Sequence, residues 1–238
     1  MELGAIERKD LSTAIAERLK ELIVAGRFRP GERLPSEREL ARVLKVTRTT
    51  LREALKILET LRFVAIRQGD GVRVRDFLRV ANIEVLADLL FRNGRLDPSI
   101  LANILEARRI MGEAIASLAA KRASQAQVEE YRARVQRLKD LADAPSQFQE
   151  ADLDCFDALA EAAGNLVFVF VLNSIRPVYL ARREVFEPLY REPKAIVEGH
   201  ERLLSALESG DEEGARSAAA ELLTVPGDMD GISEEEGP

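Results

Sequence analysis

The first apolar residues of the chain recur with the spacing of a helix. Between residues 11 and 25 they stand at i, i+4, i+7 and i+8, so they share one face of an amphipathic helix. Gly26 follows and is expected to end this helix. A turn-rich connector then runs from 29 to 35. The residues of the apolar face are Ile15, Leu19, Leu22 and Ile23.

Two more helices are predicted directly after the connector. Ser36 and Glu39 have the S-x-x-E spacing of a capping box, which predicts a short helix that ends near Leu44. Thr47 is the expected N-cap of a third helix. Apolar residues again repeat along one face of each helix, and we interpret them as core. They are Leu40, Leu44, Leu51, Leu55 and Leu58.

A β-hairpin is predicted after the third helix. The runs 63–66 and 72–74 are rich in β-prone residues, and the Gln68-Gly69-Asp70-Gly71 stretch between them is typical of a hairpin turn. Three helices followed by a hairpin is the order of a winged helix-turn-helix. We therefore predict that residues 1–77 form such a domain.

The rest of the chain has a helical pattern. No convincing strand pattern appears beyond residue 78, apart from an ambiguous apolar run at 166–172. We expect a mainly α protein in which residues 78–225 form an all-helical bundle. Residues 226–238 carry five acidic residues and no basic one, which predicts a disordered acidic tail. Helices are expected at about 80–92, 97–123, 125–142, 146–163, 166–187, 193–208 and 211–224.

Composition narrows the class of protein. Charged residues make up 32% and aromatic residues 5%, which favours helices with solvated faces over a β-sandwich. The single cysteine, Cys155, excludes an intrachain disulfide and a zinc cluster of thiolates. No apolar run approaches the roughly 18 residues of a membrane span, and no signal-peptide pattern follows Met1. We expect a cytoplasmic protein with no membrane partner.

The charge is distributed unevenly along the chain. The net charge of −6 by itself argues against nucleic acid as a partner. However, residues 1–76 hold 17 Lys and Arg against 12 Asp and Glu, whereas residues 77–238 hold 18 against 29. Phosphate binding needs a local positive face rather than a basic chain, and the first third of the chain supplies one.

The start of the third predicted helix carries the residue types that bind DNA. A recognition helix presents its first turn to the major groove, where Arg can bond guanine and Thr can reach bases or phosphates. For the stretch 47–52 alone, a merely capped helix with solvated arginines is an equally good interpretation. The order of elements and the basic excess favour DNA. The expected contacts are Thr47, Arg48, Thr49, Thr50 and Arg52, with Arg38 at the backbone and Gln68-Gly69 at the wing tip.

This part of the chain resembles the GntR family of winged-helix regulators. The stretches Arg29–Ala41 and Val46–Leu55 carry the likeness, which extends over about residues 11–76. The resemblance implies contact with double-stranded DNA at the positions just named, although Gln68 stands where relatives often have histidine. We expect a homodimer whose two recognition helices meet the half-sites of a palindromic operator.

The second region resembles the FCD domain of the FadR subfamily. Many FCD domains bind a divalent metal through one Asp and three His, and the likeness places Asp152, Phe156, His200 and Leu222 at those positions. Two of these side chains are apolar, and the chain has a single histidine. One carboxylate and one imidazole do not complete a transition-metal site. We therefore predict no metal and no cofactor, with His200 as a hydrogen-bonded core or pocket residue.

In lacking a complete set of metal ligands, the second region resembles the acyl-CoA-responsive members of the FadR subfamily. That resemblance implies an apolar acyl tunnel in the helical domain, where each buried CH₂ contributes roughly 0.8 kcal/mol. Arg108 would anchor a carboxylate or phosphate group, or else form a surface salt bridge. The expected effector-binding residues are Arg108, Asp152, Phe156, Asn173, Tyr179, His200 and Leu222.

Two alternatives stay open. In the first, the same DNA-binding regulator responds to a small organic acid held by Arg108. In the second, the helical domain is a metal-dependent enzyme that uses Asp152 and His200. The second has too few metal ligands and no visible nucleophile–base pair, so we predict a transcription regulator whose effector is a fatty acyl-CoA, and not an enzyme.

Overall fold

A computed structural model of the chain describes residues 11–67, 69–79, 83–92 and 95–224. Contacts within the chain divide it into two compact units, Met1–Leu96 and Asp97–Pro238. The change of unit thus lies further along the chain than the boundary predicted after residue 77. The predicted acidic tail at 226–238 lies outside the described residues.

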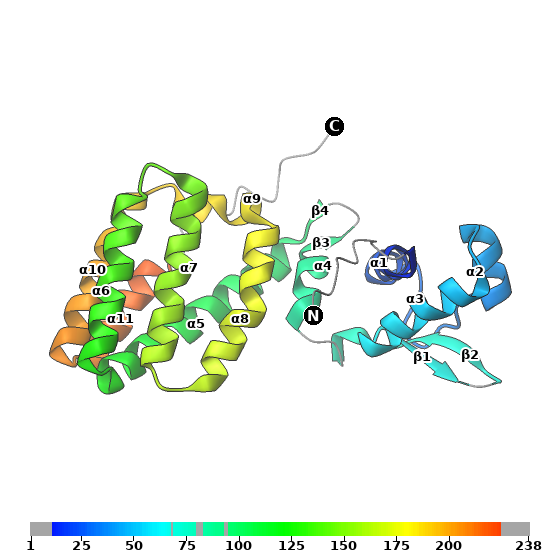
Figure 1. Cartoon of the computed structure of the whole chain (residues 1–238), viewed down its shortest axis with the longest axis horizontal. Coiled ribbons are helices and arrows are strands. Elements are labelled where there is room, and N and C mark those ends of the chain that lie inside the picture. Colours follow the sequence, from blue (N-terminus) through cyan, green and yellow to red (C-terminus); the bar gives the residue numbers. More distant parts are fainter. Residues whose placement is uncertain (1–10, 68, 80–82, 93–94, 225–238) are drawn as a thin grey trace, which may run out of the picture. The chain divides into compact units, whose positions relative to one another are not determined.

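The first unit begins with three helices, as predicted. They are α1 (Leu11–Val24), α2 (Glu37–Leu44) and α3 (Arg48–Thr60) (Figure 1). The Ser36 hydroxyl accepts a hydrogen bond from the Glu39 backbone N–H at 3.3 Å, and the Thr47 hydroxyl accepts one from Thr50 at 3.2 Å. Each cap satisfies a backbone donor that has no partner within the helix, which fixes where α2 and α3 begin.

The predicted hairpin follows α3. Strand β1 (Val64–Arg67) pairs antiparallel with β2 (Gly71–Val74), and Arg67 stands opposite Gly71 next to the turn. The connector before α2 joins the other edge of β2 through a bridge between Arg33 and Arg73. The wing is therefore tied to the segment that leads into α2.

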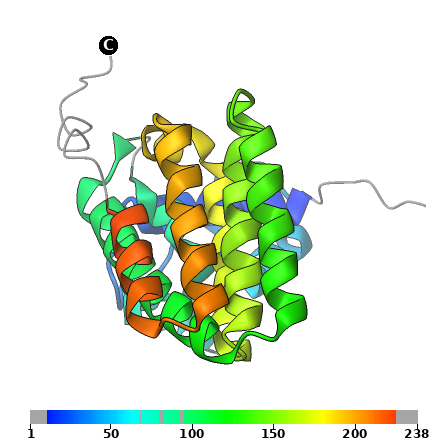
Figure 2. The same ribbon diagram turned by 90° about the vertical axis from the view of Figure 1, so that its left-hand side faces the viewer.

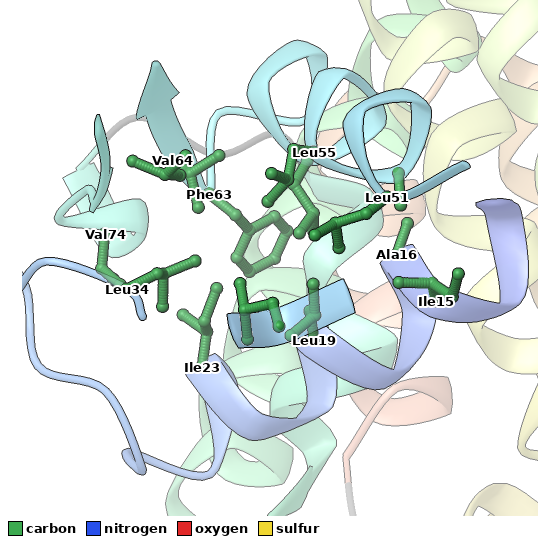
Figure 3. Close-up of a cluster of buried hydrophobic side chains, with 14 of the residues drawn as sticks. Ile15, Ala16, Leu19, Ile23, Leu34, Leu51, Leu55, Phe63, Val64 and Val74 are labelled. Atoms are coloured by element: carbon green, nitrogen blue, oxygen red, sulfur yellow. The ribbon is translucent and has the colours of Figure 1, made fainter. Parts of the chain in front are cut away.

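One apolar core holds the first unit together. Figure 3 shows Leu19 and Ile23 of α1 pointing toward Leu55 of α3 and Phe63 at the start of the hairpin. Leu55 and Phe63 are fully buried. Burying a side chain of this size contributes roughly 1.5–3 kcal/mol, so this core fixes α3 against α1.

The segment from 77 to 96 differs from the helix predicted at 80–92. Its described residues form two 3₁₀ turns, η1 (Phe77–Arg79) and η2 (Ile83–Val85), the short helix α4 (Leu86–Leu90), and a hairpin of β3 (Phe91–Arg92) and β4 (Arg95–Leu96). Phe77 stacks on Phe63 with ring centroids 5.2 Å apart, and Lys20 of α1 forms an ion pair with Asp88 at 3.0 Å. These contacts anchor the segment to the first unit, so packing rather than helical periodicity decides its conformation.

The second unit is the predicted helical bundle. Helices α6 and α11 both pack against α10, while α5 packs against α7 and α11, and Figure 2 shows α10 between α6 and α11. The ambiguous apolar run at 166–172 is helical, but the helix predicted at 166–187 ends at residue 181. The elements are α5 (Pro98–Arg122), α6 (Gln125–Asp140), α7 (Pro145–Ala162), α8 (Leu166–Ala181), α9 (Arg183–Phe186), η3 (Glu187–Tyr190), α10 (Pro193–Ser209) and α11 (Glu212–Leu222).

Two glycines allow the end of α11 to pack closely on its neighbours. A Cβ atom placed on Gly112 of α5 would lie 2.1 Å from Cδ1 of Leu223, and one on Gly199 of α10 would lie 2.8 Å from Cδ1 of Leu222. Both distances are shorter than any van der Waals contact. The two leucines at the end of α11 thus occupy the space that a side chain at either position would fill.

We expect Leu55→Ala to destabilise the first unit by about 2–5 kcal/mol, because it removes a fully buried side chain and leaves a cavity. Urea unfolding of the full chain, followed by circular dichroism, measures the change. Val43→Ala on α2 is the matched control, since Val43 is 64% exposed, and its midpoint should move little. Equal shifts for the two variants would contradict the core described above.

Candidate nucleic-acid interface and buried polar site

The start of α3 presents a polar surface to solvent. Thr47 caps the helix in an extended conformation, and its hydroxyl also lies 2.8 Å from the hydroxyl of Thr50. Arg48, Thr49 and Arg52 are exposed. The structure therefore gathers the predicted contact residues of α3 at one helix end, where the free backbone N–H groups also favour an anion.

A carboxylate of α2 holds one of these arginines. Nε of Arg52 donates to Oε2 of Glu37 at 2.7 Å, while the Arg52 side chain stays 66% exposed. An exposed ion pair of this kind contributes only about 0–1 kcal/mol to stability, so its main effect is on the direction of the guanidinium. Arg38, the next residue on α2 and a predicted backbone contact, is exposed. Sequence reasoning missed Glu37, because nothing in the pattern couples residues 15 positions apart.

The turn of the wing is braced by an arginine. Nε and Nη2 of Arg73 donate to the two carboxylate oxygens of Asp70 at 2.8 and 3.0 Å, and Nη1 donates to the carbonyl of Gly31 at 3.0 Å. The hydrogen bond from Arg73 lowers the pKa of Asp70 below its ordinary value. Gly69 is exposed at the turn with φ of 84°, whereas Gln68 lies outside the described residues.

A second group of predicted residues meets inside the helical unit. Asp152 of α7 and His200 of α10 are almost completely buried, and His200 Nε2 lies 2.9 Å from Asp152 Oδ1. The Tyr190 hydroxyl donates to Asp152 Oδ2 at 2.9 Å, and the Tyr131 hydroxyl lies 2.7 Å from His200 Nδ1. A carboxylate only accepts hydrogen bonds, so His200 carries its proton on Nε2 and, when neutral, accepts from Tyr131 through Nδ1.

Arg108 of α5 approaches the same carboxylate. Its Nη2 lies 3.7 Å from Asp152 Oδ2, and its Cζ lies 5.7 Å from the ring centre of Phe156. The side chain is 18% exposed, so it is not the surface salt bridge considered from the sequence. Burial alone would raise the pKa of Asp152. The hydrogen bond and charge of His200, the charge of Arg108 and the Tyr190 hydroxyl outweigh burial and hold that pKa below its ordinary value.

Two buried donors near this network lack a partner among the described residues. They are the hydroxyl of Tyr179, whose ring stacks on Phe186 at 4.0 Å, and Nε2 of Gln149. Gln149 precedes Asp152 by three residues, on the same face of α7. A buried donor without a partner costs about 1–3 kcal/mol, so both groups would gain from an acceptor.

Five of the seven predicted effector-binding residues lie in or beside this network. Arg108, Asp152 and His200 interact directly, the ring of Phe156 meets His200 edge-on at 5.4 Å, and Tyr179 interacts electrostatically with Arg108. Leu222 packs against Gly199, the neighbour of His200. Asn173 is exposed on α8 and takes no part in the network.

The network also includes two residues that sequence reasoning missed. All three tyrosines of the chain interact with this network, yet only Tyr179 was predicted. Tyr131 and Tyr190 lie 69 and 38 positions from their partners. The only hint in the sequence was that the chain has just three tyrosines, and this number does not show which side chains they contact.

The side chains present do not fit the metal ion that the FCD resemblance implies. Both carboxylate oxygens of Asp152 and both ring nitrogens of His200 are used by protein partners. Within the part of the chain that the structure describes, no three His, Cys, Asp or Glu side chains form a group that could hold a metal. The absence of a metal stays a prediction.

Cys155 lies next to this network on α7 and is fully buried. Burial raises the pKa of its thiol, and the negative charges of Asp152 and Asp154 raise it further. Such a thiol is neutral near pH 7 and makes a poor nucleophile.

Among the residues that the structure describes, no helix combines the length and apolar character that crossing a membrane requires.

We expect Asp152→Asn to destabilise the helical unit by about 3–5 kcal/mol near neutral pH, because it leaves Arg108 buried beside a neutral amide. Because folding lowers the pKa of Asp152, its ionised form stabilises the fold above the unfolded pKa of about 3.9. That contribution is lost as the pH falls through the folded pKa.

Urea midpoints measured across the acid range test this. The wild type should lose stability on acidification more steeply than Asp152→Asn. Tyr190→Phe, which removes a single hydrogen bond, should cost about 1 kcal/mol. Parallel pH profiles for the wild type and Asp152→Asn would contradict the ionised state of this carboxylate.

Known protein families match both units of the chain. The family model for bacterial regulatory proteins of the gntR family matches residues 11–74, and the FCD domain model matches residues 103–225. The solved structure of Lar from Listeria monocytogenes covers 92% of this chain and 95% of its own, with 20% identity and a TM-score of 0.57. This likeness supports the fold.

Curated relatives match over most of the chain. The HTH-type transcriptional regulator Mce2R of Mycobacterium tuberculosis is 36% identical over 225 residues, which are 94% of this chain and 93% of the relative. The fatty acid metabolism regulator protein of Escherichia coli O1:K1 / APEC is 32% identical over 209 residues, or 87% and 83% of the two chains. The chain belongs to the GntR family of bacterial transcription regulators, in which it joins a winged helix-turn-helix to an FCD effector domain of the FadR type.

Proposed function

We propose that α3 lies in the major groove of DNA and reads base edges with the arginines at its start. The observation that carries this proposal is the exposed polar surface at Thr47, Arg48, Thr49 and Arg52. Arg48 and Arg52 are four positions apart on one helix face. Each can form a two-pronged hydrogen bond with guanine, and the Glu37 carboxylate directs Arg52. Arg38 on α2 is suited to a phosphate of the backbone.

The proposed DNA-binding form is a homodimer. One recognition helix contacts only a few base pairs, so a regulator gains selectivity by placing two helices on half-sites about one DNA turn apart. A palindromic operator matches such a pair. The effector then acts by binding better to the state of the dimer in which the two helices no longer fit that spacing.

The double variant Arg48→Ala/Arg52→Ala should lose sequence-selective DNA binding. Each two-pronged contact with guanine provides about 1–3 kcal/mol of discrimination, so losing both should lower selectivity by about 30-fold to about 20,000-fold. Binding is measured on a duplex that the wild-type chain selects from a random pool and on a shuffled duplex of equal length.

Arg132→Ala/Arg134→Ala on α6 is the matched control. It removes the same charge from the helical unit, at the exposed Arg132 and the partly exposed Arg134, and it should keep the selectivity of the wild type. If Arg48→Ala/Arg52→Ala still distinguishes the two duplexes as well as the wild type does, α3 is not the recognition helix.

We propose a fatty acyl-CoA as the effector. Three kinds of observation support this ligand. Relatives at 32–36% identity are named fatty acid metabolism regulator proteins, and apolar side chains, Phe156 and Leu222, stand where the FCD resemblance places metal ligands. The buried donors of Arg108, Tyr179 and Gln149 suit the oxygen atoms at the polar end of an acyl compound.

A small organic acid is the second candidate, and one feature favours it. The charge on Arg108 is mostly buried, yet its nearest carboxylate, that of Asp152, lies at 3.7 Å, which is longer than a hydrogen bond. A guanidinium binds a carboxylate best through two parallel hydrogen bonds. A ligand carboxylate could supply them, together with a partner for the Tyr179 hydroxyl.

Thermal unfolding of the full chain with palmitoyl-CoA, free CoA or succinate separates these ligands. A ligand at 100 times its Kd adds about 2.7 kcal/mol of stability. We expect palmitoyl-CoA to raise Tm and to weaken binding to the selected duplex, and free CoA and succinate to do neither. Stabilisation by succinate alone would favour the organic acid and refute the acyl proposal.

The variant Arg108→Ala tests the site itself. Its Tm should respond to palmitoyl-CoA less than that of Arg109→Ala, a control at the neighbouring and half-exposed position of α5. Elemental analysis of the purified protein adds an independent check, because stoichiometric metal would revive the metal-dependent enzyme and contradict the acyl site.

A further inference from the structure

The side chain of Arg33 lies against the base of the wing turn, although Arg33 belongs to the connector before α2. Its backbone is fixed beside β2, because the neighbouring Leu34 N–H donates to the Val72 carbonyl and the Val74 N–H donates to the Glu32 carbonyl, both at 2.9 Å. The segment is therefore part of the wing rather than a loose loop. The Arg33 side chain itself is exposed.

Gly71 provides the space for this guanidinium. A Cβ atom at position 71 would lie 2.9 Å from Nε and 3.0 Å from Nη2 of Arg33, and the φ of Gly71 is 83°. The left-handed backbone at position 71 favours glycine, whereas a Cβ atom there would displace only the flexible end of the Arg33 side chain. The guanidinium of Arg33 therefore lies close to Gly71, the first residue after the wing turn.

Arg33 belongs to a small group of charges that we call the wing-turn cluster: Arg33, Arg67, Asp70 and Arg73. Arg67 stands opposite Gly71 in the hairpin, and Arg73 takes both carboxylate oxygens of Asp70. The lowered pKa of Asp70, due first to the Arg73 hydrogen bond, also reflects the charges of Arg33 and Arg67. One carboxylate therefore faces three arginines.

The wing-turn cluster has more positive charges than its single carboxylate can neutralise. In the segments that the structure describes, Arg33 and Arg67 have no ion pair, whereas Arg73 is used to brace Asp70. The other acids close by also have backbone partners: Glu32 accepts from the N–H of Arg29 and Glu59 from that of Ile66, both at 2.8 Å. Two exposed guanidinium groups remain beside one turn, which is the arrangement that attracts a phosphate.

We propose that Arg33 and Arg67 bind the phosphate backbone of DNA beside the groove that α3 enters. This inference rests on the proposed function of α3, since the same duplex is the ligand. The contact is independent of base sequence: it adds affinity and fixes the orientation of the wing, while α3 supplies the selectivity. Gly71 leaves room for the Arg33 guanidinium, and the paired Asp70 leaves both Arg33 and Arg67 without an ion pair among the described residues.

The dependence of binding on salt tests this inference. Each phosphate contact contributes about 0.9 to the slope of log K against log salt concentration. Arg33→Ala and Arg67→Ala should each lower that slope by about 0.9 per bound chain, and the double variant by about twice as much. The loss of affinity should be equal on the selected and the shuffled duplex. Arg33→Lys should keep most of the slope, because it keeps the charge.

Arg18→Ala on α1 is the matched control. It removes one exposed positive charge from the same unit, and it should leave the slope unchanged. Circular dichroism of each variant checks that the exposed substitutions leave the fold intact. If the slopes of Arg33→Ala and Arg18→Ala agree with that of the wild type, the wing-turn cluster does not bind phosphate.

The outcomes also separate this inference from the proposed function. Loss of selectivity in Arg48→Ala/Arg52→Ala with an unchanged slope in Arg33→Ala/Arg67→Ala would overturn the phosphate site and leave α3 as the recognition helix. A loss in Arg33→Ala confined to the selected duplex would overturn it too, because a phosphate contact cannot distinguish base sequences. A wild-type chain that prefers no duplex would refute the proposed function instead.

Discussion

The arrangement of the helical unit depends on the need to satisfy one buried carboxylate. Asp152 is 1% exposed, and an ionised group so placed costs several kcal/mol unless partners surround it. Its partners come from different elements: Arg108 from α5, His200 from α10 and Tyr190 from η3. His200 in turn meets Tyr131 of α6. One charge therefore links five elements, and none of them can shift without leaving a polar group unpaired.

Local signals explain why most helix starts could be predicted from the sequence. Ser36, Thr47 and Asp211 each bond a backbone N–H three residues ahead, so the cause and its effect lie in the same short stretch. The described residues between 77 and 96 show the opposite case. Their conformation depends on contacts of Phe77 with Phe63 and of Asp88 with Lys20, which the pattern of the segment itself does not contain.

The two parts of the candidate site also differ in whether they depend on neighbouring residues or on residues far apart in the sequence. The polar surface of α3 was predictable because all of its residues lie within a stretch of six positions, 47–52. The buried network was only half predictable, since the resemblance supplied Asp152 and His200 but not the tyrosines that complete their hydrogen bonds. Asn173 was expected there and is exposed. Periodicity would have helped little, because positions on one helix say nothing about which side chain another helix brings to meet them.

Because Cys155 is buried, its reaction with thiol reagents can report how often the helical unit opens. Thiol reagents attack the thiolate, and this cysteine is both inaccessible and kept protonated by its surroundings. An alkylating reagent can modify it only during the moments when α7 separates from its neighbours. Since the sequence contains no other thiol, the rate of labelling measures how often the helical unit opens, without any engineered probe.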